Sequence, residues 1–301
     1  MAALGCLRRE EMQQWLIGVV VSLFIVTVSA GVAQLGGDGG QQFRGLSVFV
    51  WCGIFAFAVQ WILFIHAWSI RSEKYFDLAG SLTYVTVFLS ALLLVGRLDL
   101  RSLLIVLLVL VWALRLGPFL YSRIKAAGHD KRFVSIRNSF PTFLMTWTLQ
   151  GGWVYLTGCA GLAAVTSGVS VGPDWTLYLG FSLWCFGFIV EVVSDRQKTA
   201  FRAIEENSDR FISTGLWAWS RHPNYFGEIV LWLGIAIIAF PALQGLQIFT
   251  MLAPLWVILQ MTVISGTRML EPRADKKWGN DEEYQVYKKR TPLLMLWPPR
   301  R

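Results

Sequence analysis

The sequence predicts an all-α membrane protein, a polytopic bundle of about eight transmembrane helices within a range of about seven to ten. Hydrophobic residues make up 55% of the 301 residues and charged residues only 15%, whereas a soluble protein would carry about 25% charged residues. The mean hydropathy is +0.51. Apolar runs of about 20 residues, the length needed to cross a bilayer, recur along the whole chain.

Eight such runs follow one another, separated by polar or glycine-rich connections. They lie near residues 14–34, 47–68, 77–96, 102–120, 142–166, 175–194, 224–240 and 246–266. The seventh should begin at Pro223, because proline suits the first turn of a helix, and should stop before Pro241. After the eighth, Glu271 directly precedes Pro272, and the residue before a proline disfavours helical geometry, so the helix is expected to break there.

The distribution of Lys and Arg predicts the orientation of the chain. With eight spans, 23 of the 27 Lys and Arg residues lie on the side that holds both termini and the 195–223 connection. We therefore expect a multi-pass protein with both termini in the cytoplasm, placed in the endoplasmic reticulum or another endomembrane if the cell is eukaryotic. This bias accounts for most of the net charge of +8, and no basic stripe with stacking aromatics indicates nucleic-acid binding. The four cysteines lack metal-ligand spacing, so no metal site is expected.

The densest group of polar residues is STGLWAWSRHPNYFGE, residues 213–228. It places Arg221 and His222 at the N-terminal end of the seventh helix, where free backbone N–H groups and the helix dipole favour an anion. Asn224 and Glu228, four residues apart, share one face of that helix. In the alternative interpretation, the Arg–His pair marks only the membrane boundary and the other two side chains satisfy each other.

A second polar stretch, GFIVEVVSDRQKTAFRAIEE, leaves the sixth span. Glu191, Asp195, Lys198 and Arg202 fall within about 60° on one face of a helix. The alternative is a solvated, salt-bridged face, in which each pair contributes a few tenths of a kcal/mol. Glu191 argues against that alternative, because it lies within the apolar zone, where an unpaired carboxylate costs several kcal/mol.

The C-terminal tail is rich in both aromatic and charged residues. Tyr284, Tyr287 and Arg290 follow one another at intervals of three, so one side of a short helix presents two phenols and a guanidinium. Trp278 and Trp297 make the tail apolar as well as charged, and we expect it to fold back on the membrane domain.

Three segments together resemble one family. They are E-x-x-x-D-x-Q-K with FR following (191–202), GLW-x-x-SRHPNYFGE (215–228), and LE-P (270–272) leading to WG-x-x-x-x-Y-x-x-Y-x-x-R-T-P (278–292). In these motifs the chain resembles the DUF1295 family, which belongs with the steroid 5-alpha-reductase C-terminal domain. The resemblance divides the chain into N-terminal spans, 1–70, and a steroid 5-alpha-reductase-like membrane domain with cytoplasmic, cofactor-facing loops, 71–301.

The resemblance implies NADPH-dependent reduction of a conjugated C=C bond in a lipid substrate taken from the bilayer, sterol- or fatty-acyl-like. It implies cofactor-binding roles for seven residues, which are Asp195, Arg202, Arg210, Asn224, Tyr225, Glu228 and Arg290. Arg221, His222, Glu271, Tyr284 and Tyr287 complete the candidate cofactor-binding set. The reaction also needs an acid, for which Tyr84, Glu191 and Tyr225 are the catalytic candidates.

Two other functions stay open. The R-H-P-x-Y sequence also resembles the isoprenylcysteine carboxyl methyltransferases, in which it and a downstream glutamate, here Glu271, would hold S-adenosylmethionine. A non-enzymatic lipid-binding or scaffold protein that keeps the fold without turnover is the third possibility.

Overall fold

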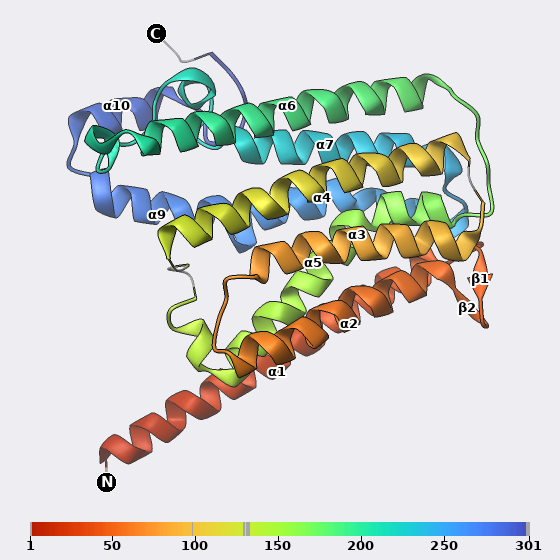
Figure 1. The fold of residues 1–301 in the computed structure, drawn as a ribbon, viewed down its shortest axis with the longest axis horizontal. Coiled ribbons are helices and arrows are strands. Elements are labelled where there is room, and N and C mark those ends of the chain that lie inside the picture. Colours follow the sequence, from red (N-terminus) through yellow and green to blue (C-terminus); the bar gives the residue numbers. More distant parts are fainter. Residues whose placement is uncertain (1, 98, 129, 131–132, 299–301) are drawn as a thin grey trace. The chain divides into compact units, whose positions relative to one another are not determined.

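The computed structural model describes residues 2–97, 99–128, 130 and 133–298, with side chains from residue 11 onward. The chain is helical almost throughout (Figure 1), which confirms the all-α class. Its long helices are α1 (Ala2–Gly36), α2 (Val48–Ser69), α3 (Phe76–Val95), α4 (Leu100–Ala127), α5 (Phe140–Thr166), α6 (Trp175–Ala203) and α7 (Pro223–Ala239). A short antiparallel hairpin of β1 (Gln42–Phe43) and β2 (Leu46–Ser47) follows α1.

Seven helices in the described part of the chain are long and apolar enough to cross a membrane. They correspond to seven of the eight predicted spans, and the remaining one, the fifth, near 142–166, forms α5. Helix α5 is 27 residues long, but its Thr, Gly and Gln residues lower its hydropathy. All of its residues from Val154 to Thr166 are buried, and it packs against α1, α2 and α3. A helix surrounded by other helices needs fewer apolar residues than one that faces lipid.

The chain divides into two compact units. Unit 1 comprises residues 1–173 and 239–251, and unit 2 comprises residues 174–238 and 252–301. The division at residue 70, which follows the family resemblance, stays a prediction.

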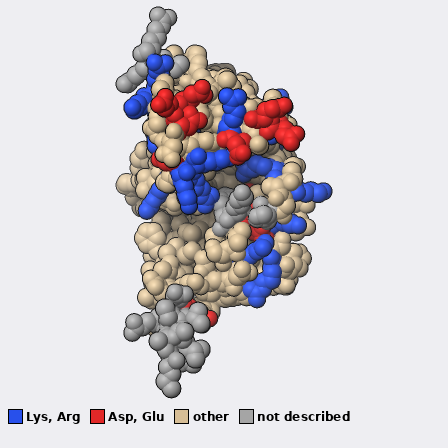
Figure 2. Space-filling view, turned by 90° about the vertical axis from the view of Figure 1, so that its left-hand side faces the viewer, with Lys and Arg blue, Asp and Glu red and all other residues tan. Residues whose placement is uncertain are grey.

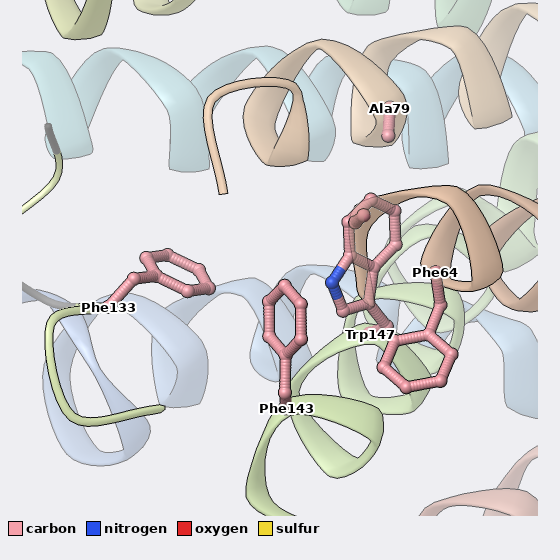
Figure 3. Close-up of a cluster of buried hydrophobic side chains, with 6 residues drawn as sticks. Phe64, Ala79, Phe133, Phe143 and Trp147 are labelled. Carbon is pink, nitrogen blue, oxygen red and sulfur yellow. The ribbon is translucent and has the colours of Figure 1, made fainter. Parts of the chain in front are cut away.

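An aromatic cluster lies in the core of unit 1. Figure 3 shows Phe64 of α2, Ala79 of α3, and Phe143 and Trp147 of α5 beside Phe133 from the connection before α5. The rings of Phe143 and Trp147 are 6.1 Å apart at 82°, an edge-to-face geometry that contributes about 0.5–1.5 kcal/mol beyond burial.

Glu73, in the connection between α2 and α3, joins that connection to the one before α5. Its carboxylate accepts hydrogen bonds from the Asp130 N–H at 3.1 Å and from Arg137 at 3.0 Å. Burial alone would raise the pKa of Glu73, but these two bonds hold that pKa below its usual value. The carboxylate is therefore ionised at neutral pH and fixes the two connections together.

In unit 2, glycines bring α6 and α7 into close backbone contact. A Cβ added at Gly187 of α6 would lie 2.5 Å from the carbonyl oxygen of Gly227, and one added at Gly227 would lie 2.6 Å from that of Gly187. Only glycine permits this approach. The contact fixes where the N-terminal end of α7 lies along the charged face of α6.

The last predicted span is not one regular helix. A 3-10 segment (Gly245–Leu252) is followed by α8 (Ala253–Leu259), a π-helical turn (Gln260–Ile264), α9 (Gly266–Trp278) and α10 (Glu282–Arg290). The expected break at Glu271 was wrong, because α9 continues through Pro272. The break lies at Ser265, whose φ of −133° and ψ of −102° follow the π turn. A proline can be accommodated in a helix with the loss of one hydrogen bond, whereas the π turn ends the α8 hydrogen-bonding pattern.

Candidate functional site

In unit 2, Glu271 of α9 binds both residues at the N-terminal end of α7. Its Oε2 accepts a hydrogen bond from Arg221 Nη1, and its Oε1 lies 2.8 Å from His222 Nε2. The three side chains are largely buried, with exposed fractions of 14% for Arg221, 8% for His222 and 19% for Glu271. The structure thus brings together three of the predicted site residues, which we call the Arg221–His222–Glu271 cluster.

His222 is the neutral member of this cluster. Burial lowers the pKa of His222 below its usual value, and the positive charges of Lys198 and Arg221 act in the same direction, while Glu271 only partly opposes them. Because a carboxylate can only accept, the neutral imidazole carries its proton on Nε2 and leaves Nδ1 as an acceptor. The ring stacks on Tyr225 with 5.4 Å between centroids and 9° between planes.

The segment before α7 is anchored on two sides by other elements of unit 2. The Leu216 N–H donates to Gln197 Oε1 at 2.9 Å, and Trp217 Nε1 donates to the carbonyl oxygen of Ser194 at 2.9 Å. From α10, the phenol of Tyr287 donates to the carbonyl oxygen of Trp217 at 2.7 Å. These bonds hold a segment that would otherwise be a loose connection between two helices.

Next to this segment in unit 2, aromatic rings pack against one another and a lysine lies over one of them. Phe211 lies 5.3 Å from the ring of Tyr284 and 5.4 Å from that of Tyr287. Lys198 Nζ lies 4.5 Å from the centre of the Trp217 ring, within the range of a cation–π contact. Figure 2 shows Lys and Arg side chains, with Asp and Glu among them, on the face of the molecule that includes α10.

Asp275 joins α9 to α10. It accepts hydrogen bonds from the phenol of Tyr284 at 3.1 Å and from Lys288 Nζ at 2.5 Å. Burial raises the pKa of Tyr284, and Asp275 raises it further; burial also raises the pKa of Tyr287. Both phenols therefore stay protonated at neutral pH and act as hydrogen-bond donors, which is how they hold α10.

The other predicted site residues take different positions. In unit 2, Glu191 and Asp195 are buried on α6, whereas Arg202, Arg210 and Arg290 are exposed; Asn224, Tyr225 and Glu228 are half-buried in the first turns of α7. Arg202 donates to the carbonyl oxygens of Asn207 and Ser208 at 3.1 and 2.9 Å. It therefore supports the turn after α6.

Tyr84 lies in unit 1, on α3, and is not part of the Arg221–His222–Glu271 cluster. Its ring packs edge-on against Trp112 at 5.0 Å and 89°, and only 4% of the residue is exposed. The ring of another catalytic candidate, Tyr225, contacts His222 of the cluster within unit 2.

Sequence reasoning missed three residues that hold the site. Trp217 and Ser220 fix the segment before α7, and Asp275 fixes α9 to α10. The signal for Trp217 and Ser220 was their position in the motif itself, GLW-x-x-SRHP. No comparable pattern marked Asp275, whose partners lie 9 and 13 residues further along the chain.

Comparison with known proteins places the chain in a family. Residues 63–291 match DUF1295, a family described as proteins of unknown function. The chain belongs to the DUF1295 family. The match includes the whole Arg221–His222–Glu271 cluster, and it confirms the resemblance inferred from the three sequence motifs.

This DUF1295 protein is also similar to curated relatives. It is 30% identical to 3-oxo-5-alpha-steroid 4-dehydrogenase 1 of Mus musculus over 126 residues, 40% of this chain and 49% of the relative. It is 29% identical to the Rattus norvegicus protein of the same name over 166 residues, 54% of this chain and 59% of the relative. An uncharacterized Schizosaccharomyces pombe protein is 23% identical over 202 residues, 58% of each chain. The chain thus spans about half the length of these relatives. No solved structure gives a significant match.

Proposed function

We propose that this DUF1295 protein is a membrane oxidoreductase that uses NADPH to reduce a conjugated C=C bond in a lipid, sterol- or fatty-acyl-like. The likeness to mouse and rat 3-oxo-5-alpha-steroid 4-dehydrogenase 1 supports the oxidoreductase class and a lipid-like substrate. The seven apolar helices support the bilayer as the source of that substrate.

The Nε donor of Arg221 is the observation that best supports NADPH as the cofactor. Arg221 Nη1 is bound to Glu271, whereas Arg221 Nε is buried and has no hydrogen-bond partner among the described residues. Leaving a buried donor unsatisfied costs about 1–3 kcal/mol. A phosphate oxygen would satisfy it, and the nearby N-terminal end of α7 favours a negative charge. The residues present therefore fit a dinucleotide phosphate.

When bound, NADPH would supply a hydride to one carbon of the substrate's double bond. Around it, Arg221 and the exposed Arg202 and Arg210 would bind phosphate groups, because guanidinium donors match phosphate oxygens. Asn224 and Glu228 would bind the carboxamide or the ribose hydroxyls.

The second carbon of the double bond needs a proton. We assign this role to the phenol Oη of Tyr225, whose ring lies against His222. A general acid has to lie within hydrogen-bond reach of the atom it protonates, and the Tyr225 ring stacks on His222 of the Arg221–His222–Glu271 cluster.

One observation favours a second function, that of a methyltransferase using S-adenosylmethionine. Glu271 neutralises Arg221, and His222 is neutral, so the cluster carries no net charge. An ion pair with no net charge attracts a pyrophosphate only weakly. It suits the amino-acid group of S-adenosylmethionine, whose carboxylate would lie toward Arg221 and whose ammonium would lie toward Glu271.

Thermal stability of the detergent-solubilised protein with NADPH, NADH and adenosylhomocysteine separates these functions. A ligand at 100 times its dissociation constant stabilises the folded state by about 2.7 kcal/mol. We expect NADPH to raise the melting temperature and NADH to raise it less, because NADH lacks the 2′-phosphate. A shift with adenosylhomocysteine alone would establish the methyltransferase. If none of the three ligands changes the melting temperature, the non-enzymatic lipid-binding or scaffold function is the one that remains.

A further inference from the structure

The chain that follows α10 pairs with the segment that carries Arg221 and His222. The Arg221 N–H donates to the carbonyl oxygen of Pro292 at 2.9 Å, and the Trp297 N–H donates to that of Trp219 at 3.1 Å. All of these bonds join residues of unit 2. We call residues 291–298 the C-terminal strap, because their backbone pairs with residues 219–221, which directly precede α7.

Ser220 joins the strap to the cluster through its side chain. Its hydroxyl donates to the carbonyl oxygen of Leu294 at 2.9 Å and accepts the His222 N–H at 3.1 Å. The residue has an exposed fraction of 0%. A hydroxyl has one proton and two acceptor lone pairs, so a single buried atom connects residue 294 to residue 222. Alanine at this position would leave both of these partners unsatisfied.

The strap acts through its backbone. Carbonyl oxygens of Pro292 and Leu294 and the N–H of Trp297 make the three bonds, whereas the side chain of Met295 is 60% exposed. The start of the strap is fixed independently, because Tyr287 of α10 binds the carbonyl oxygen of Trp217 and the Thr291 N–H donates to the Tyr287 carbonyl oxygen. The strap therefore begins at a fixed point and presents main-chain acceptors to the residues before α7.

We propose that Ser220 is a positioning residue for the Arg221–His222–Glu271 cluster, and that the C-terminal strap is part of the same site. Where the cluster is taken to bind NADPH, this inference rests on the proposed function. The positioning itself is a property of the apo protein. Without the Ser220 hydroxyl, the His222 N–H loses its acceptor, and the imidazole loses its fixed orientation toward Glu271.

Labelling of His222 with diethyl pyrocarbonate tests the positioning without any cofactor. The full-length, solubilised protein is labelled at neutral pH, and the rate at each histidine is read by mass spectrometry of its peptides. We expect Ser220→Ala to raise the rate at His222 about three- to tenfold, the range that corresponds to one lost hydrogen bond. Ser220→Thr keeps a hydroxyl and should restore the wild-type rate. Met295→Ala, in the same strap, should not change it.

His66, on the exposed surface of α2, serves as the internal reference. An unchanged rate at His66 in every variant shows that the effect at His222 is local. A chain ending at Arg290 should label His222 at least as fast as Ser220→Ala; if that chain does not fold, the Ser220→Ala and Ser220→Thr pair decides. Equal rates at His222 in the wild type and Ser220→Ala would overturn the proposal.

Titration with NADPH then connects the positioning to the function. We expect Ser220→Ala to raise the dissociation constant about three- to tenfold and Ser220→Thr to restore it. If the wild-type protein does not bind NADPH, the proposed function fails, while the labelling rates still decide the role of Ser220.

Discussion

His222 Nε2 lies 2.8 Å from Glu271 Oε1, although 49 residues separate the two in the chain. The lowered pKa of His222 makes this a bond between a neutral donor and a carboxylate. The same carboxylate holds Arg221. One residue of α9 thus orients both residues at the start of α7 and supplies the counter-charge of Arg221, and ligand affinity should depend on it.

Replacement of Glu271 by glutamine should destabilise the protein by about 1–3 kcal/mol. The amide keeps one acceptor oxygen, so its NH2 group replaces the acceptor at either Arg221 or His222, and the largely buried guanidinium loses its counter-charge. Thermal unfolding in detergent measures the loss. Glu206→Gln, at an exposed position in the same unit, removes the same charge and should have little effect. Equal losses in the two variants would count against the cluster.

The stability of the protein should depend on pH through His222. The folded-state pKa of His222 is lowered, so below the unfolded value of about 6.5 the unfolded state binds a proton that the folded state does not. The contribution is fully present above about pH 7 and is lost as the pH falls toward the folded-state value. His222→Gln should flatten the melting temperature over this interval. An identical pH slope in the variant and the wild type would refute the assignment.

Arg221→Lys should weaken NADPH binding at least tenfold, which is about 1.4 kcal/mol. Lysine keeps the positive charge but loses the Nε donor that we assign to a phosphate oxygen. Titration of the solubilised protein with NADPH measures the change. Arg196→Lys, at an exposed position on α6, is the matched control and should bind as the wild type does.

Gly187→Ala should destabilise unit 2 by about 1–3 kcal/mol, because its Cβ would lie 2.5 Å from the Gly227 carbonyl oxygen. The two helices would have to separate by several tenths of an ångström or more. Gly31→Ala in α1 meets no atom within 4 Å and should be neutral or slightly stabilising. Thermal unfolding compares the two, and an equal response would argue against the close contact of α6 and α7.

Several elements could be predicted from the sequence because their causes are local. The start of α7 at Pro223 follows from the fixed φ of proline, and the spacing of Tyr284 and Tyr287 predicted the short helix α10. The predicted break at Glu271, before Pro272, was wrong because that rule is also local. The chain turns instead after the π turn Gln260–Ile264, which ends seven residues before Glu271. The composition of α5 did not reveal how deeply neighbouring helices bury it.

By itself, the sequence determined that this is a helical membrane protein, where most of its helices lie, and that polar residues gather before α7. These properties depend on hydrophobicity and backbone preference within single segments. Tertiary structure alone decided that Glu271 meets His222 and that Ser220 meets Leu294, 74 residues away. Such pairs form only when α6, α7, α9 and α10 pack together, and no periodicity along the chain encodes which side chains then face each other.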